Sequence, residues 1–138
     1  MSREIHIQDV VEGIHATKRA ICSRMSKVSG TAITPSQWAM LQILYYKKKM
    51  SIKDLATALS ITGSAVTQTV NELESKGCLK RSPDPSDRRS ITVSPTSRCI
   101  KMMSKLEKEI NESCSELFSK LTDSELKTFA QLYRKISQ

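Results

Sequence analysis

The stretch from Ser51 to Thr96 decides the fold, and it reads SIKDLATALSITGSAVTQTVNELESKGCLKRSPDPSDRRSITVSPT. Its first part carries apolar residues at helical spacing, at Ile52, Leu55, Ala56 and Leu59. A polar break follows around Ser60, Thr62 and Gly63. The next part turns Ala65, Val66, Val70 and Leu73 to one face and Ser64, Thr67, Gln68 and Asn71 to the other. The pattern predicts two short helices joined by a turn, the second with an exposed polar face.

A short hairpin is predicted directly after these helices. Cys78 to Ser82 is typical of a strand, Pro83 to Asp87 of a turn, and Arg89 to Ser94 of a returning strand with Ile91 and Val93 on one face. Arginines occupy one arm of the hairpin and the region near its tip, at Arg81, Arg88 and Arg89. A polar helix followed by a basic ribbon suits one groove of a DNA duplex and its neighbour. We therefore predict a winged helix-turn-helix region over residues 34–95.

Long helices are predicted on both sides of this region. Residues 7–28 place a seam at steps of three and four, formed by Ile7, Val11, Ile14, Lys18, Ile21, Met25 and Val28. Ser29, Gly30 and Thr31 are expected to end that helix. A core-facing helix of a monomer would show the same spacing. A terminal helix has little preceding chain to pack against, however, which favours pairing with a second subunit.

Three further helix starts are visible. Thr34 and Gln37 form a capping box with Pro35 at the first helical position, and Trp38 is expected to anchor the core. Ser51 to Asp54 and Thr122 to Glu125 resemble capping boxes as well. Thr96 to Leu121 is predicted as one helix, whose apolar stripe comprises Ile100, Met103, Ile110, Cys114, Leu117 and Leu121.

The elements together predict a mainly α fold with a small β-hairpin wing, of the α+β type. We expect a single domain over residues 1–138, with residues 7–33 and 96–138 forming a helical dimerisation region.

The positive charge is concentrated on the predicted DNA-binding region. The chain of 138 residues has a formal net charge of +8. Residues 47–101 hold eleven Lys and Arg against five Asp and Glu, which is +6. A charge that served only solubility would be spread more evenly, so an anionic partner such as nucleic acid is favoured.

Other functional classes have little support in the residues. The cysteines at 22, 78, 99 and 114 lack the short spacing of metal or redox motifs, and His6 and His15 have no acidic cluster beside them. The first residues have no apolar signal segment, and no run approaches a membrane span. No nucleophile–base pair or phosphate loop is present. We therefore expect a cytoplasmic protein that is not an enzyme and uses no cofactor, metal or membrane.

The wing makes a family resemblance specific. The run from Leu73 to Gly77, then Arg81, the segment from Asp84 to Arg89, Val93 and Thr96 resemble the MarR family of transcription regulators. The likeness covers nearly the whole chain, including both helical ends.

The resemblance implies a homodimer that binds double-stranded DNA at a pseudo-palindromic operator, usually as a repressor. Family members often release DNA on binding a small anionic aromatic effector, or on cysteine oxidation. The helix from Thr62 to Lys76 would enter the major groove and the wing the adjacent minor groove. Asp87 matches an aspartate that positions an arginine, and Arg88 and Arg89 match the two wing arginines; the sequence leaves open which of them enters the groove.

The chain departs from the family pattern in two places. Pro95, Thr96 and Cys99 stand where members usually have Leu, Thr and Gly, which suggests tighter packing around Cys99. Gln68 stands where a basic residue is frequent, and an amide would favour a contact to adenine.

The candidate DNA-binding residues follow from both arguments. Phosphate contacts are expected from the basic residues Lys53, Lys76, Lys80, Arg81 and Arg98. The main set is Lys53, Thr62, Ser64, Thr67, Gln68, Asn71, Lys76, Arg81, Asp87, Arg88 and Arg89. Two alternatives remain open at this point. One is a winged-helix module that binds a protein partner without an operator, and the other is a regulator of the same family that senses cysteine oxidation.

Overall fold

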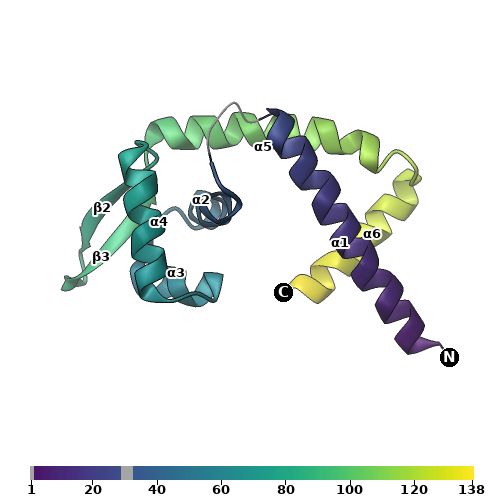
Figure 1. Ribbon diagram of the computed structural model, residues 1–138, viewed down its shortest axis with the longest axis horizontal. Coiled ribbons are helices and arrows are strands. Elements are labelled where there is room, and N and C mark those ends of the chain that lie inside the picture. The colour runs from purple at the N-terminus through teal and green to yellow at the C-terminus, as the bar shows by residue number, and fades with distance from the viewer. Residues whose placement is uncertain (1, 29–32) are drawn as a thin grey trace. The chain divides into compact units, whose positions relative to one another are not determined.

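A computed structural model describes residues 2–28 and 33–138, with residues 25–28 described at the level of the backbone (Figure 1). The elements in order are α1 Arg3–Val28, α2 Pro35–Lys47, β1 Met50–Ser51, α3 Ile52–Leu59, α4 Gly63–Ser75, β2 Leu79–Asp84, β3 Asp87–Pro95, α5 Ser97–Leu117 and α6 Asp123–Ser137. The predicted fold class, mainly helical with a small hairpin, is confirmed. The predicted end of the first helix at Ser29, Gly30 and Thr31 lies outside the described residues.

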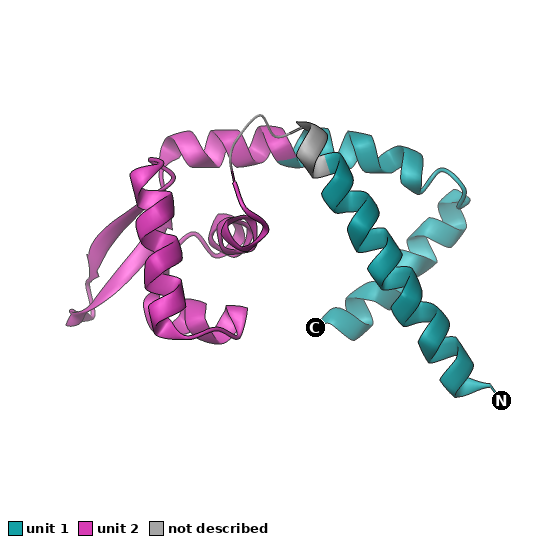
Figure 2. Ribbon diagram, viewed as in Figure 1, with its two compact units in different colours: residues 1–30, 107–138 teal, residues 31–106 magenta. Residues whose placement is uncertain are grey.

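The chain forms two compact units (Figure 2). Unit 1 comprises residues 1–30 and 107–138, and unit 2 comprises residues 31–106. Unit 2 contains both short helices, the hairpin and all the candidate DNA-binding residues. The assignment of the long terminal helices to dimerisation stays a prediction.

Unit 2 is built around an aliphatic core between helices and sheet. Its fully buried side chains come from α2, α3, α4, β3 and the start of α5, and the largest are Met40, Leu41, Leu44, Leu55, Val66, Val70, Leu73, Val93 and Cys99. Trp38 is half-buried and packs against this core rather than forming its centre. Removing such apolar surface from water is the main force that holds two short helices in place.

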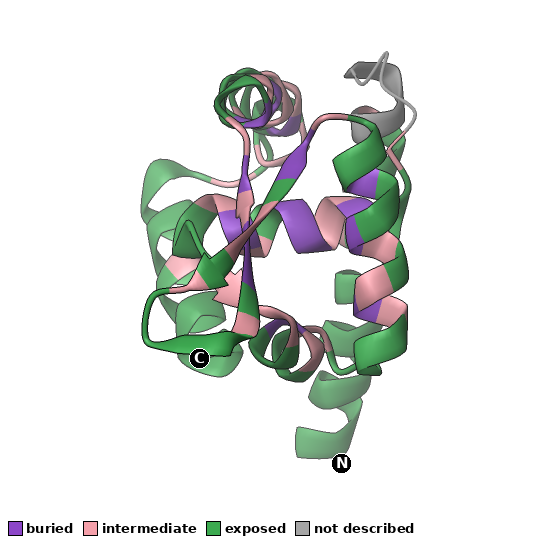
Figure 3. Cartoon of the chain, turned by 90° about the vertical axis from the view of Figure 1, so that its left-hand side faces the viewer, coloured by how far each residue is buried: buried purple, intermediate pink, exposed green. Residues whose placement is uncertain are grey.

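The sheet has three antiparallel strands in the order β1-β3-β2. Met50 pairs with Val93, and Arg81 pairs with Val93 from the other side. We call β2, β3 and the turn between them the wing. Figure 3 shows its strands changing from buried at the base to exposed at the tip.

Side-chain caps fix the starts of the helices, as predicted. Thr34 and Gln37 form the reciprocal capping box of α2, and Thr122 and Glu125 form that of α6. The Ser51 hydroxyl accepts from the backbone N–H of Asp54 at 3.1 Å, which is the serine half of the predicted box of α3. Each cap satisfies a backbone N–H that has no partner within the helix.

The turn between α3 and α4 differs from the prediction in one detail. Gly63 was expected in the polar break, but it is the first residue of α4. The left-handed residue that ends α3 is Ser60, with φ of 55° and its N–H directed to the carbonyl groups of Ala56 and Thr57. A small polar residue tolerates this conformation less well than glycine, so the spacing of apolar residues did not indicate Ser60 as the end of α3.

The wing is longer than predicted. Pro83 and Asp84 were assigned to the turn but belong to β2, and the turn itself is reduced to Pro85 and Ser86. The Asp84 carboxylate accepts from the backbone N–H of Ser86 at 3.0 Å and from its hydroxyl at 2.8 Å, which closes the tight turn. Because the strands extend past the helices, Ile91 is 45% exposed although it shares a face with buried Val93.

The helix α5 also differs from its prediction. It ends at Leu117, and the residues from Phe118 to Leu121 form turns, with the N–H of Ser119 bonded to the carbonyl of Glu116 at 3.2 Å. Ile100 was predicted on the buried stripe but is 44% exposed, and Cys99 takes its place at 1% exposure. The spacing from Cys99 to Met103 is four residues, so that pair follows the inner face of the helix better.

Unit 1 leaves many apolar side chains exposed. On α1 they are Ile5, Ile7, Val10, Val11 and Ile14, and on α6 they are Leu126, Phe129, Leu132, Tyr133 and Ile136. The Arg24 guanidinium donates to the carbonyl of Ser113 at 3.1 Å and joins α1 to α5 within the unit. No helix in the described ranges has the length and apolar character that crossing a membrane requires.

Candidate nucleic-acid interface

The helix α4 presents the polar face that the sequence predicted. Thr62 is its N-cap, and its hydroxyl accepts from the backbone N–H of Ala65 at 3.2 Å. Ser64, Gln68 and Asn71 are exposed on the outer face. Thr67 is half-buried and donates its hydroxyl to the carbonyl of Gly63 at 2.9 Å, which leaves the hydroxyl oxygen able to accept. An exposed row of hydroxyl and amide groups is the chemistry that base edges and phosphates require.

The C-terminal end of α4 is closed by a glycine and an arginine. Gly77 has φ of 71°, and the Arg98 guanidinium lies 3.1 Å from the position that a Cβ would take there. Arg98 also donates to the carbonyl of Lys76 at 2.5 Å. The Arg98 guanidinium thus caps the end of α4, and the phosphate contact expected of this exposed residue stays a prediction. Lys80, its companion in that prediction, is exposed on β2.

Arg81 connects the wing to α4. Its Nε lies 3.3 Å from a carboxylate oxygen of Glu74, and its Nη2 donates to the side-chain oxygen of Asn71. Asn71 therefore keeps its two amide N–H groups to donate outward. The ion pair with Glu74 reduces the charge that Arg81 offers to a phosphate. Glu74 was not among the candidate residues, because a glutamate seven residues before an arginine forms no local pattern that indicates the pairing.

The tip of the wing is ordered by its two aspartates. Hydrogen bonds from Ser86 lower the pKa of the exposed Asp84 carboxyl, because they stabilise its charged form. The Asp87 carboxylate accepts from the backbone N–H of Arg89 at 3.0 Å. Asp87 thus positions the backbone that carries Arg89. Arg88 and Arg89 are both exposed, and neighbouring strand residues point to opposite faces of the wing.

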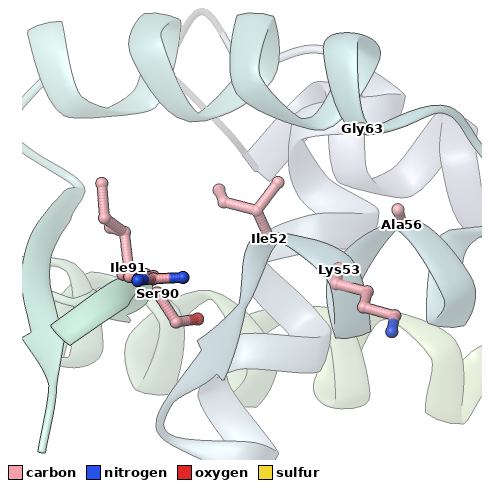
Figure 4. A pocket seen from close by; sticks show the side chains of 7 residues that line it. Ile52, Lys53, Ala56, Gly63, Ser90 and Ile91 are labelled. Carbon is pink, nitrogen blue, oxygen red and sulfur yellow. The ribbon is translucent and has the colours of Figure 1, made fainter. Parts of the chain in front are cut away.

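A hollow of about 530 Å³ lies between α3, the start of α4 and the wing (Figure 4). Its walls are Ile52, Lys53, Ala56, Gly63, Arg89, Ser90 and Ile91. Figure 4 shows the α3 residues on one side of the hollow and Ser90 and Ile91 of β3 on the other. The hollow therefore combines an apolar surface with two cationic side chains and the positive end of the α4 dipole.

The hollow distinguishes the two wing arginines. Arg89 lines it together with Lys53, whereas Arg88 does not. Ile52 and Ile91 were assigned to inward faces from periodicity alone. No sequence signal could show that the wing extends beyond the core and leaves Ile91 at the edge of this hollow.

Lys76 is the candidate whose surroundings differ most from the prediction. Its ammonium group donates to the side-chain oxygen of Gln37 at 2.9 Å. Gln37 is only 3% exposed, so the head of Lys76, an exposed residue, reaches a buried partner. Gln37 was recognised only as a capping residue, and its contact with α4 had no sequence signal.

Three of the four cysteines are poorly accessible. Cys78, Cys99 and Cys114 are buried, and Cys22 is exposed. Burial raises the pKa of the Cys99 thiol, and the neighbouring Cys78 raises it further, partly through a hydrogen bond between the thiols. A thiol held protonated is a poor nucleophile. Across residues 2–28 and 33–138, no three His, Cys, Asp or Glu side chains gather as metal ligands would.

Comparison with known proteins identifies the family. The model of the MarR family matches residues 33–91, which span α2, α3, α4 and most of the wing. The chain belongs to the MarR family. Its relatives are transcriptional regulators and not enzymes.

Two curated relatives illustrate the relationship. A protein named as the putative transcriptional regulatory protein for the hcr operon in Thauera aromatica is 27% identical over 104 residues, which cover 75% of this chain and 63% of that protein. The HTH-type transcriptional regulator MhqR of Bacillus subtilis is 23% identical over 119 residues, which cover 86% of this chain and 82% of MhqR.

Solved MarR-family structures share the fold. A mutant MarR of E. coli complexed with operator DNA has a TM-score of 0.73 and 24% identity, and the match covers 96% of this chain and 94% of that one. NadR in complex with 4-hydroxyphenylacetate has a TM-score of 0.74 and 19% identity, covering 94% and 92%. As a MarR-family member, this chain is a DNA-binding transcription regulator with a winged-helix fold.

Proposed function

We propose that this MarR-family chain acts as a homodimeric repressor that binds a pseudo-palindromic operator and leaves it when a small anionic aromatic effector binds. In this proposal α4 contacts base edges in the major groove and the wing enters the adjacent minor groove. The two contacts come from one compact unit, as reading of neighbouring grooves demands.

The hollow between α3, α4 and the wing carries the proposal. The DNA strand that separates a major from a minor groove must pass between the two elements that enter those grooves. Lys53 and Arg89 lie on the walls of this space, and Lys53 can neutralise a phosphate there. Ile52, Ala56 and Ile91 supply an apolar surface for the sugars. Arg89, whose backbone N–H donates to the Asp87 carboxylate, is our candidate for the arginine that enters the minor groove.

The exposed apolar faces of α1 and α6 support the dimer. Among the side chains that the structure describes, five large apolar ones on each helix are exposed in the single chain. Contiguous apolar surface of this kind is typical of a subunit interface. The effector part of the proposal is supported by NadR, whose ligand 4-hydroxyphenylacetate is a small aromatic anion.

The alternative of a protein-binding module has less support. A helix that docks on a protein would expose Leu, Phe or Trp. The outer face of α4 exposes Ser64, Gln68 and Asn71 instead.

Selection of random duplex DNA by the purified protein tests the proposal. We expect a sequence with two inverted half-sites whose centres lie about 10 base pairs apart, or a multiple of one helical turn. The double variant Arg88→Ala, Arg89→Ala should lose most affinity for that sequence in a gel shift. Selection of no preferred sequence would contradict operator binding, and a single unpaired half-site would contradict the dimer.

A further inference from the structure

Gln37 is a buried polar side chain at the point where α2 meets the last turn of α4. It is 3% exposed, and only Gln37 and Thr92 have this combination of polarity and burial within the described chain. A buried amide destabilises a fold unless its donors and acceptors are satisfied. The contacts of Gln37 therefore define what this residue does.

The Gln37 amide joins three partners. Its Oε1 accepts from the backbone N–H of Thr34 at 3.2 Å and from the ammonium group of Lys76 at 2.9 Å. Its Nε2 donates to a carboxylate oxygen of Glu72 at 2.8 Å. Both lone pairs of the oxygen are used, and the reverse orientation of the amide would set oxygen against carboxylate and nitrogen against ammonium. The charges of its partners thus determine the orientation of the Gln37 amide.

The same amide belongs to the first turn of α2 and holds the last turn of α4. Glu72 and Lys76 lie one helical turn apart at the end of α4, and Gln37 lies between their charged groups. Asn71, which faces outward from α4, is the neighbour of Glu72. A rotation of α4 about its axis would break the bonds to Gln37 and move the outer face at the same time.

We propose that Gln37 is a positioning residue for DNA recognition, which sets the orientation of α4 through Glu72 and Lys76. The inference rests on the proposed function. It also reassigns Lys76, an exposed residue whose ammonium group donates to Gln37, to supporting α4 in place of a phosphate contact.

A charge-swap series tests the positioning. Gln37→Glu keeps the acceptor for Thr34 and Lys76 but sets a second carboxylate against Glu72, so operator affinity should fall about tenfold. Adding Glu72→Gln places an amide donor at position 72 opposite the new carboxylate at position 37, and the double variant should return to within about threefold of the parent. Affinities are compared at a temperature where circular dichroism shows every protein folded.

The salt dependence separates positioning from phosphate binding. Lys76→Met should weaken operator binding while leaving the slope of log K against log salt unchanged. Lys53→Met is the matched control, and the magnitude of its slope should fall by about 0.9 for each phosphate that the lysine neutralises in the parent protein. Lys76→Met also keeps the test decisive if Gln37→Glu fails to fold.

The outcomes distinguish this inference from the function it rests on. If the parent protein prefers no sequence, the proposed function fails. If the parent binds an operator and Gln37→Glu binds equally well, or Glu72→Gln gives no rescue, the positioning role is overturned. A reduced salt slope for Lys76→Met would return Lys76 to the phosphate-binding residues and overturn its assignment here.

Discussion

Single side chains determine which polar groups the candidate DNA-binding surface exposes. Arg81 pairs with Glu74 and donates to the oxygen of Asn71, so the Asn71 amide is oriented before DNA arrives. Gln68 is exposed on the same outer face of α4, one helical turn earlier. A preorganised amide loses less entropy on binding than a mobile one. Asn71 and Gln68 are therefore expected to contribute differently to base preference.

Gln68→Ala should relax base preference at one position in each half-site. Removing a bidentate amide contact to a base costs about 1–3 kcal/mol of discrimination. Competition binding with duplexes that differ at single positions measures this change. Gln42→Ala, an exposed amide on α2, is the control and should keep the parent profile. An unchanged profile in Gln68→Ala would show that this residue reads no base.

Cys99 makes the folded protein sensitive to alkaline pH. Burial and Cys78 raise the pKa of its thiol above the ordinary value of 9.0. At pH values between the ordinary pKa of the thiol in the unfolded chain and its raised pKa in the folded chain, the unfolded chain has released the proton and the folded chain has kept it. The free energy of unfolding therefore falls as pH rises. One such group contributes at most about 1.4 kcal/mol per pH unit.

Urea unfolding at pH 8 and pH 10 measures this decrease, and Cys99→Ala should show a smaller decrease than the parent. The difference between the two proteins in free energy of unfolding at pH 8, where the thiol is protonated in both states, gives the cost of the lost packing. An equal decrease in both proteins would contradict the assignment.

At the scale of elements, the helix starts were more predictable than the helix ends. Thr34, Ser51 and Thr122 each act as the expected cap, because a capping residue is a local signal. The end of α5 at Leu117 and the two-residue turn of the wing were missed. Both depend on packing and on hydrogen bonds such as those of Ser86 to Asp84, which spacing alone does not encode.

Gly77→Ala should destabilise unit 2 at the joint between α4 and β2. A Cβ at φ of 71° is strained by about 1–2 kcal/mol, and it would displace the Arg98 guanidinium 3.1 Å away. Chemical denaturation measures the change in the free energy of unfolding. Gly13→Ala on α1 is the control, since a Cβ there meets nothing within 4 Å. A variant at Gly77 as stable as the parent would contradict the strain.

At the scale of the whole molecule, the sequence predicted the exposed residues of the candidate DNA-binding surface better than the contacts that support them from inside. Exposed residues such as Gln68 and Arg89 were predictable, because polar residues on a helix face and arginines near a turn are visible as patterns. The inward contact of Lys76 with Gln37 joins residues 39 positions apart, and no local pattern reports it.

Charge placed on α6 should separate the proposed dimer. Leu132→Glu with Ile136→Glu puts carboxylates on the exposed apolar face, where pairing would bury them at high cost. Light scattering after size exclusion should show a monomer with reduced operator affinity. Gln131→Glu is the control and should stay dimeric. A double variant that remained a dimer would place the interface elsewhere.

The central claim is that unit 2 binds one DNA sequence through phosphate and base contacts together. The most direct measurement is the affinity of the parent protein for its selected duplex and for a scrambled duplex across a series of salt concentrations. We predict that log K falls steeply and linearly with log salt for both, with the selected duplex bound at least about 10³-fold more tightly. Equal affinity for the two duplexes, or binding indifferent to salt, would contradict the account.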